Sequence, residues 1–473
     1  MPGLSPPDWL EPREYQSAAV NAWLSNQGQG VLHMATGTGK TITSLLAAAE
    51  LAELQNDRLA LIIAAPYQHL VDQWVSELHD FGLSPIRAYQ SRNSWTDEAV
   101  SQLTEFGTGS RDFTAIVTTH ATFCSNHFQN VLDRVDGART MVIGDEVHHL
   151  GAPHFRKHLP ESIRARLGLS ATPERWYDDE GTDSVMEYFS NGIVFEYGLE
   201  EAIAGGHLCE YYYVPHIVEL TDEESEDYIA ISRAIGKRMG NVSGDIGDAD
   251  LQDDEQLKQL LFKRARLVGT AQNKLSRLRS LLQRTDDVHH TLVYCSDGKI
   301  AAEGEATKRQ LDAVTEMLGH DLGLKTHKFT YEEDQDKREQ LLEDFERGVL
   351  DALVAIRCLD EGVDVPATET AFILASSSNP RQFVQRRGRI LRPHPSKDFA
   401  VIHDFIVAPP GDIRHGEPDS IFNLERRLVQ KELQRASTFA AAARNHPDAE
   451  LSSIPTGTGS LATLKKDFNL LDI

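Results

Sequence analysis

Short apolar runs rich in β-branched residues recur along this chain, and amphipathic or turn-rich stretches separate them. Continuous apolar runs are typical of strands that a parallel sheet buries on both faces, and the stretches between them are long enough for crossover helices. The runs lie at residues 60–64, 115–118 and 141–143, and again at 291–294, 352–355, 371–375 and 399–403. The pattern predicts an α/β protein with two doubly wound parallel-sheet domains.

The order of these runs indicates how the chain divides. A length of 473 residues exceeds the usual size of one hydrophobic core, so more than one domain is expected. We expect a first sheet domain at 1–205, a linker and helical insertion at 206–285, a second sheet domain at 286–410 and a C-terminal helical segment at 411–473. In the insertion, Thr221 and Glu224 form a capping-box pattern, and leucines recur at a helical period over 257–282 beside a basic face. A solvated helix explains this basic face somewhat better than a nucleic-acid contact does.

The strongest local signal is HMATGTGKT at residues 33–41, which follows an apolar pair and precedes a helix-favouring stretch. A loop between a strand and a helix N-terminus points backbone N–H groups at an anion. Gly37 and Gly39 would let the backbone curl around phosphates, Lys40 would place a charge on the β and γ groups, and Thr41 would offer a hydroxyl to Mg²⁺. The loop residues expected to contact a nucleotide are Thr36, Gly37, Thr38, Gly39, Lys40 and Thr41. A chance Gly-Lys-Thr turn is the alternative, and the first glycine of the general pattern is replaced by Met34.

A second signal is MVIGDEVHH at residues 141–149, where an apolar strand ends in paired carboxylates. Asp145 is placed to hold Mg²⁺ through water, and Glu146 to orient and deprotonate an attacking water molecule. A solvated turn would explain such a pair alone, but its position at a strand end after the phosphate loop favours a nucleoside triphosphatase. His148 and His149 have no third ligand spaced nearby, which disfavours zinc.

Three strings resemble motifs II, III and VI of the superfamily 2 helicases: DEVHHLGAP, LGLSATPER and QRRGRILRP. Within that superfamily they are most similar to the XPB-like branch and the type III restriction-subunit helicases. The matching motifs run in the family's order over most of the chain, from about residue 11 to about residue 393. The resemblance implies that both sheet domains are RecA-like. After SATP the string ERWYDDEGTD is longer and more acidic than the XPB branch usually has, so this chain departs from the family there.

The resemblance also assigns roles to individual residues. Gln16, with Arg13 nearby, matches the position that recognises adenine, and Asp364, with Glu361 and Gly362, matches the motif near the ribose. In similar fashion Thr118 and Thr119 would face the phosphates of a nucleic-acid strand, and Ser170 and Thr172, with His148, would couple hydrolysis to domain movement. Arg389 and Arg392 match the arginine fingers, with Gln385 beside them. For Arg386 and Arg387, a surface basic cluster and a phosphate clamp both stay open.

Composition restricts the class of protein, its location and the way in which it could hold nucleic acid. A chain that is 40% hydrophobic and 25% charged is typical of a folded globular protein, and its longest apolar stretch is too short to cross a bilayer. The N-terminus lacks the basic patch and apolar core of a secretory signal, so we expect a cytoplasmic protein. The net charge of −25 disfavours bulk attraction to nucleic acid, so a strand would have to be held in a local groove. The four cysteines lack the spacing of a zinc site or a disulfide framework.

These features together favour a DNA helicase or translocase that uses ATP and Mg²⁺ and tracks a single strand, with a role in DNA repair or anti-phage defence. Two other functions stay open. One is an RNA helicase, since motifs II and VI are shared by DNA and RNA branches. The other is an ATP-gated subunit that clamps nucleic acid without unwinding it.

Overall fold

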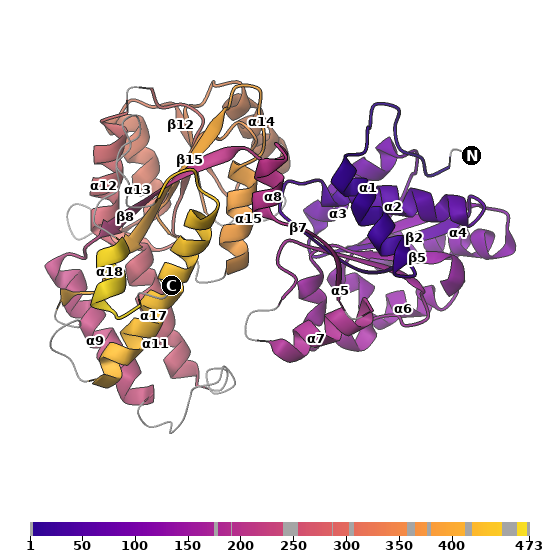
Figure 1. The fold of residues 1–473 in the computed structure, drawn as a ribbon, viewed down its shortest axis with the longest axis horizontal. Coiled ribbons are helices and arrows are strands. Elements are labelled where there is room, and N and C mark those ends of the chain that lie inside the picture. The colour runs from indigo at the N-terminus through magenta and orange to yellow at the C-terminus, as the bar shows by residue number, and fades with distance from the viewer. Residues whose placement is uncertain are drawn as a thin grey trace. The chain divides into compact units, whose positions relative to one another are not determined.

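The computed structural model describes residues 3–174, 178–190, 192–239, 254–285, 287–301, 307–356, 365–375, 380–411, 419–446 and 461–470. The chain divides into two compact units, Met1–Gly205 and Gly206–Ile473. Each unit has its own parallel sheet with helices against it, which confirms the predicted α/β class (Figure 1). Among the described residues no helix has the length and apolarity needed to cross a membrane.

The sheet of the first unit has seven strands in the order β3-β4-β2-β5-β6-β1-β7, and every neighbouring pair is parallel. The strands are β1 (Gln29–Met34), β2 (Leu59–Ala65), β3 (Ile86–Ala88), β4 (Phe113–Thr119), β5 (Thr140–Gly144), β6 (Ala165–Ser170) and β7 (Ile193–Tyr197). The helices are α1 (Glu14–Ser25), α2 (Lys40–Leu54), α3 (Gln68–Asp80), α4 (Thr96–Thr108), α5 (His120–Phe123), α6 (Asn126–Leu132), α7 (Asp179–Tyr188) and α8 (Leu199–Ala204). Short 3₁₀ turns are η1 (Arg92–Ser94), η2 (Gly137–Arg139), η3 (Val147–Gly151) and η4 (Arg156–His158).

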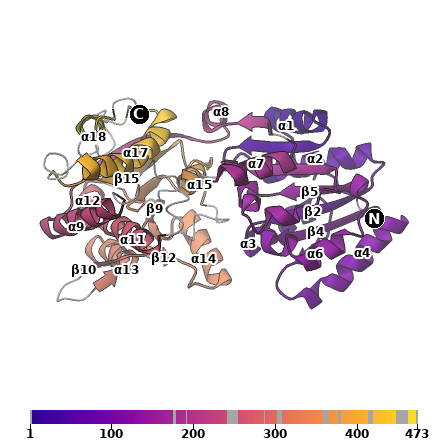
Figure 2. The same ribbon diagram turned by 90° about the horizontal axis from the view of Figure 1, so that it is seen from below.

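This sheet buries both of its faces, as the continuous apolar runs predict. Along β2, Leu61 and Ile63 pack with Trp23 and with residues of α2 and α3. Ile62 and Ala64 belong to a separate core with residues of α4 and α6. Because successive side chains of a strand point to opposite faces, one uninterrupted apolar run supplies both cores. Figure 2 shows β2, β4 and β5 lying together between the helices of this unit.

The second unit has a six-stranded sheet in the order β12-β13-β9-β14-β15-β8, again with every neighbouring pair parallel. Its strands are β8 (Glu210–Val218), β9 (Thr291–Tyr294), β12 (Thr326–Phe329), β13 (Ala352–Ala355), β14 (Thr370–Ile373) and β15 (Phe399–Val407), and β10 (Lys299–Ala301) and β11 (Thr307–Arg309) form a separate antiparallel ribbon. The helices are α9 (Asp222–Met239), α11 (Glu255–Gly269), α12 (Gln272–Leu282), α13 (Gln310–Glu316), α14 (Gln335–Glu346), α15 (Pro380–Ile390), α17 (Asp419–Ala441) and α18 (Leu461–Asp467), with a π-turn η5 (Met317–Asp321). The apolar runs predicted at 291–294 and 352–355 are β9 and β13.

The segment expected to be a linker and helices, 206–285, contains a strand that the sequence reading missed. β8 forms one edge of the second sheet and pairs with β15 from Glu210 to Val218. Pro215 lies within this strand. A proline has no N–H to give to a ladder, so it is tolerated on an edge strand, where one side of the backbone needs no partner. The sheet of the second unit therefore begins well before residue 286.

The helical part of this segment differs in one respect from the prediction. The capping box is confirmed, since the Thr221 N–H donates to the Glu224 carboxylate at 3.0 Å and the Glu224 N–H donates to the Thr221 hydroxyl at 3.3 Å. The apolar period over 257–282, however, belongs to two helices, α11 and α12. The chain turns between them at Ala271, whose ψ of 127° is extended rather than helical.

Helices α9, α11 and α17 lie side by side in the second unit, although α17 follows more than a hundred residues later in the chain (Figure 1). A buried carboxylate joins them. Glu425 of α17 is fully buried and accepts hydrogen bonds from the hydroxyls of Tyr228 (2.5 Å) and Ser232 (2.6 Å) and from the Arg264 guanidinium (2.8 Å). Arg264 also bonds the Tyr228 hydroxyl. A buried charge is tolerated only when it is paired and hydrogen-bonded, so this cluster fixes the register of the three helices.

Candidate nucleotide site and coupling residues

The residues predicted to bind nucleotide follow the carboxyl ends of neighbouring strands in the first unit. The phosphate loop follows β1, Asp145 and Glu146 follow β5, and Ser170 ends β6, which lies between β1 and β5. In a parallel sheet these ends meet at one edge, where open α/β sheets bind their ligands. The topology therefore brings together motifs that lie far apart in the sequence.

The backbone of the phosphate loop accounts for its two glycines and for the methionine at the first position of the general pattern. Gly37 has φ +90° and Gly39 has φ +78°, a left-handed conformation that side chains disfavour. A Cβ at Gly39 would also lie 3.1 Å from Gln16 Nε2. Met34, by contrast, is the last residue of β1, and its side chain is buried in the core. Position 34 therefore has no need of a glycine.

Hydrogen bonds hold the loop in shape. The Tyr15 hydroxyl donates to the Thr38 carbonyl at 2.6 Å, and the Thr38 hydroxyl donates to the Ala35 carbonyl at 2.7 Å. Lys40 Nζ donates to the Met34 carbonyl at 3.1 Å. The Thr36 hydroxyl oxygen is buried and has no hydrogen-bond partner within the described part of the chain. A buried hydroxyl without a partner is unfavourable, so this one is available to a polar ligand.

A hollow of about 380 Å³ adjoins the loop. It is lined by Trp9, Leu10, Glu11, Arg13, Gln16, Gly37, Gly39 and Ile42. Gln16 is buried, and its carbonyl oxygen accepts the Arg13 backbone N–H at 3.0 Å. Both residues that the resemblance assigned to adenine recognition thus line this hollow. Sequence reasoning missed the exposed Trp9, because a single tryptophan outside any motif carries no signal.

Asp145 is held by groups from three parts of the fold. Its Oδ2 accepts the indole N–H of Trp74 at 2.9 Å, and its Oδ1 accepts the Glu146 N–H at 3.0 Å. Burial raises the pKa of the Asp145 carboxyl, while the Trp74 hydrogen bond and the positive charge of Lys40 act in the opposite direction. A cation beside this carboxylate would favour the ionised form still further. Trp74 was not singled out from the sequence.

Glu146, His148 and Ser170 form a connected group. Glu146 has φ +45°, an uncommon conformation for a residue other than glycine and one often found at functional sites. The Nδ1 atom of buried His148 lies 3.5 Å from Glu146 Oε2 and 3.3 Å from the Ser170 hydroxyl oxygen. The Ser170 oxygen also accepts the Thr172 N–H at 3.1 Å. The structure therefore brings together the motif II and motif III residues that the resemblance assigned to coupling.

The two threonines expected to face nucleic-acid phosphates make hydrogen bonds within the first unit. Thr118 is 0% exposed, and its hydroxyl donates to the Ala88 carbonyl of the neighbouring strand at 2.6 Å. Thr119 is also buried, and its hydroxyl oxygen caps α5 by accepting the Thr122 N–H at 3.2 Å. Both side chains have hydrogen-bond partners within the first unit, and their contact with nucleic-acid phosphates stays a prediction. Both residues lie at the end of β4, and sequence spacing could not show which way their side chains point.

In the second unit, α15 carries the predicted arginines. Arg386 donates to the Ala375 carbonyl at 3.0 Å, and Arg387 donates to the Thr438 carbonyl at 2.6 Å. Both are buried, so they hold the helix in its unit rather than forming a surface cluster. Arg389 is 9% exposed, whereas Gln385 on the same helix and Arg392 just beyond it are partly buried. Asp364, Glu361 and Gly362 lie outside the described residues.

Fold and motif placement thus define a P-loop protein with a second parallel-sheet unit. Two family models match it: "Type III restriction enzyme, res subunit" over residues 9–175, and "Helicase conserved C-terminal domain" over residues 273–394. The chain belongs to the superfamily 2 helicases, in the branch that includes the XPB-like and type III restriction-subunit helicases.

Individual proteins agree with this placement. The chain is 28% identical over 403 residues to "DNA 3'-5' translocase XPB2" of Sulfurisphaera tokodaii, covering 81% of this chain and 79% of that protein. It is 25% identical over 435 residues to "Putative DNA 3'-5' helicase Rad25" of Haloarcula marismortui, covering 92% of this chain but only 57% of that protein. The fold resembles that of the restriction-modification enzyme LlaBIII, solved bound to DNA, with a TM-score of 0.61 and 16% identity over 98% of this chain and 32% of that one.

Proposed function

We propose that this protein hydrolyses ATP in its first unit and uses the reaction to move along DNA. The observation that carries the proposal is the convergence of the phosphate loop and Asp145 at one sheet edge, close enough for the charge of Lys40 to act on the Asp145 carboxyl. Phosphoryl transfer needs little covalent chemistry from the protein. It needs groups that position the phosphates and neutralise their charge.

The residues at this edge fit a nucleotide with its magnesium ion. Lys40 would pair with the β- and γ-phosphates, and the positive-φ backbone around Gly37 and Gly39 leaves room for phosphate oxygens. Thr41 and Asp145 would hold Mg²⁺, the latter through water. Bound Mg²⁺ supplies charge neutralisation at the phosphates. Burial raises the pKa of the Asp145 carboxyl, and a bound cation would offset this by stabilising the ionised form.

Glu146 would orient the attacking water and accept its proton. Its link through His148 to Ser170 supports a coupling role, because His148 Nδ1 is within reach of both side chains. A movement of the segment after β6 would change the hydrogen bonds of His148 and hence the position of Glu146. Arg389 and Arg392 are proposed to accelerate hydrolysis, and Gln385 and Asp364 to contact the nucleotide. These four assignments rest on the family resemblance.

DNA is proposed over RNA because the named relatives are DNA translocases and helicases. A grip on phosphates rather than on base edges would give movement on a single strand with little sequence preference. Since the chain spans little more than half of some of these relatives, their full activities are not carried over. A role in repair or anti-phage defence is part of the same proposal.

The test is an ATPase assay with single-stranded DNA, duplex DNA or RNA, run beside strand-displacement and translocation assays. We expect single-stranded DNA to stimulate hydrolysis most. Lys40→Ala should abolish turnover, whereas Glu146→Gln should keep nucleotide affinity but stop hydrolysis, because an amide cannot accept a proton from water. Lys157→Ala is the matched control, since Lys157 is exposed and lies in η4, outside the phosphate loop.

The outcomes separate the candidate functions. Stimulation by RNA alone would favour an RNA helicase. DNA binding gated by ATP, with neither displacement nor translocation, would favour a clamp. Wild-type turnover in Lys40→Ala would remove the nucleotide site proposed for the first unit.

A further inference from the structure

Two adjacent histidines and a glutamate meet at the amino-terminal ends of two strands of the second sheet, away from the residues that the sequence motifs predict. His289 and His290 immediately precede β9, and Glu369 immediately precedes β14. These strands are parallel neighbours, with Thr291 opposite Thr370. The three side chains therefore lie at the amino ends of the strands, whereas Ala375, which binds Arg386, lies beyond the carboxyl end of β14.

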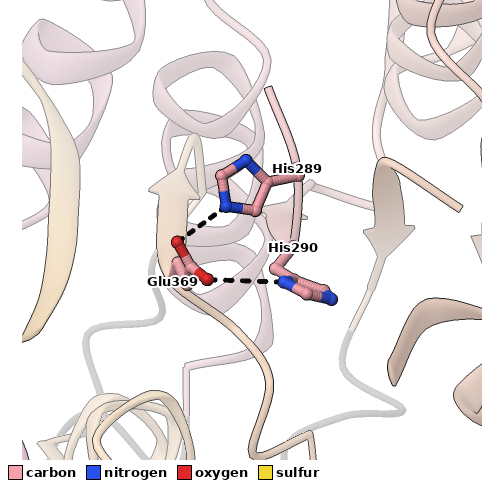
Figure 3. Close-up of side chains that lie close together, drawn as sticks. All are labelled: His289, His290 and Glu369. Atoms are coloured by element: carbon pink, nitrogen blue, oxygen red, sulfur yellow. Dashed lines mark hydrogen bonds and ion pairs between the residues drawn. The ribbon is translucent and has the colours of Figure 1, made fainter. Parts of the chain in front are cut away.

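The possible ligand atoms of these side chains converge. His289 Nε2 lies 2.9 Å from Glu369 Oε2, and His290 Nδ1 lies 3.4 Å from Glu369 Oε1. One ligand atom from each of the three residues fits within 4.8 Å of the others. Figure 3 shows the carboxylate facing both rings, with each oxygen directed at one ring nitrogen. Nitrogen and oxygen atoms this close together can surround one small cation.

The surroundings fix these side chains in place. The Glu369 N–H donates to the His290 carbonyl at 3.0 Å, which locks the two strand starts together. His290 has φ +42°, an uncommon backbone conformation outside glycine. Its Nε2 lies 3.3 Å from the Glu346 carbonyl oxygen, which can only accept, and its Nδ1 is directed at Glu369; in the tautomer that donates from Nε2, Nδ1 would be available to a cation. A hydrogen bond of this kind on the far ring nitrogen is the usual support of a metal-binding histidine.

His289 has a comparable arrangement. Its Nδ1 lies 3.5 Å from the Asp287 carboxylate, while its Nε2 faces Glu369. The cluster is also accessible, since the side chains of His290, Glu369 and His289 are 12%, 24% and 43% exposed. An ion could enter from solvent and keep water in its remaining coordination position, as three-ligand sites do.

We propose that His289, His290 and Glu369 bind a divalent transition-metal ion of the zinc type. Two imidazole nitrogens and one carboxylate oxygen suit Zn²⁺ and its neighbours, whereas Mg²⁺ and Ca²⁺ prefer oxygen ligands throughout. The ion would replace the two contacts between the rings and the carboxylate with bonds to all three side chains. It would tie the start of β9 to the start of β14 and so stabilise the second unit. This site is separate from the nucleotide site, and the proposal does not depend on ATP hydrolysis.

The experiment uses the full chain, stripped of metal with a chelator and then freed of the chelator. Zn²⁺ binding is measured at neutral pH without nucleotide, by titration calorimetry and by metal analysis after equilibrium dialysis. The variants are Glu369→Gln, which keeps the side-chain shape, and His289→Ala. The matched control is His320→Ala, which removes an exposed histidine 3.2 Å from Asp321. Circular dichroism of each metal-free preparation establishes that it is folded.

We expect wild type and His320→Ala to bind one Zn²⁺ per chain with equal affinity and to melt at a higher temperature when it is present. Glu369→Gln and His289→Ala should each lose roughly tenfold or more in affinity, along with the thermal shift, because even supporting groups around a metal contribute that much. The proposal is overturned if folded wild type binds no Zn²⁺. It is also overturned if both variants bind as tightly as wild type, or if His320→Ala loses as much affinity as they do.

Discussion

Replacing Trp74 tests whether its hydrogen bond to Asp145 contributes to the binding of a metal ion. Its indole N–H donates to Asp145 Oδ2 at 2.9 Å, and the ring is only 2% exposed. Trp74→Phe removes the donor and keeps most of the apolar contact. A hydrogen bond to a charged acceptor contributes about 1.5–3 kcal/mol. Because the Glu146 N–H still holds the other oxygen, we take the lower end, about 1.5 kcal/mol or slightly more than tenfold, as the loss in Mg²⁺ affinity.

The assay is a Mg²⁺ titration of the DNA-stimulated ATPase, together with nucleotide binding in the absence of Mg²⁺. The Mg²⁺ concentration for half-maximal rate should rise about tenfold, while metal-free nucleotide affinity stays unchanged. Removing this hydrogen bond also removes an interaction that lowers the pKa of Asp145, so as the pH is lowered the rate should begin to fall at a higher pH than in wild type.

The control for this test is Trp23→Phe. Trp23 is a fully buried tryptophan of the same unit whose indole N–H donates to the Arg166 carbonyl at 3.0 Å. Both variants lose a buried indole hydrogen bond and a similar volume, so both should lower the melting temperature, but only one loses a contact to Asp145. An unchanged Mg²⁺ requirement in Trp74→Phe, or an equal shift in Trp23→Phe, would refute the reasoning.

Three further predictions concern the second unit. Arg389→Ala should lower DNA-stimulated ATPase about a thousandfold if it acts as an arginine finger, with little change in nucleotide affinity; a fall in melting temperature with a proportional loss of basal rate would indicate a structural role instead. Arg264→Ala should destabilise the unit by about 3–5 kcal/mol in urea unfolding, because Glu425 is left buried without its cation. Adding Glu425→Gln should recover part of that loss, and no recovery would show that the buried charge is not the cause. Burial lowers the pKa of His216 to about 2 and of His403 to about 3, from 6.5, so below pH 6.5 the unfolded chain takes up protons that the folded unit does not. Stability should fall by about 2 kcal/mol per histidine between pH 6.5 and 5, and a melting temperature that is flat over this range would contradict it.

Much of this fold and site could be predicted from local sequence. Strands buried on both faces must be apolar along their whole length, so β2, β9 and β13 stood out as continuous runs. The phosphate loop could also be predicted from the sequence, because Gly37 and Gly39 occupy backbone conformations that favour glycine. Such features depend on neighbours in the chain, and a sequence displays those directly.

Other features depended on which segments meet in space. β8 was read as linker because its only sheet partner, β15, lies nearly two hundred residues later. Thr118 was expected to face a ligand because the motif gives its position but not the direction of its side chain, which the neighbouring strand β3 determines.

The contacts around charged groups likewise could not be predicted from the sequence. Trp74 reaches Asp145 only because α3 packs against β2 and β4, and β2 is the neighbour of β5 in the sheet. Glu369 meets His289 and His290 only because β9 and β14 are neighbours in register. Apart from β8 and the break between α11 and α12, the sequence by itself indicated which segments form strands, helices and phosphate loop, since backbone preference and apolar period are local properties. Only the tertiary structure decided which polar side chains meet, because hydrogen bonds and ion pairs form between whatever groups the strand order and helix packing bring within about 3 Å.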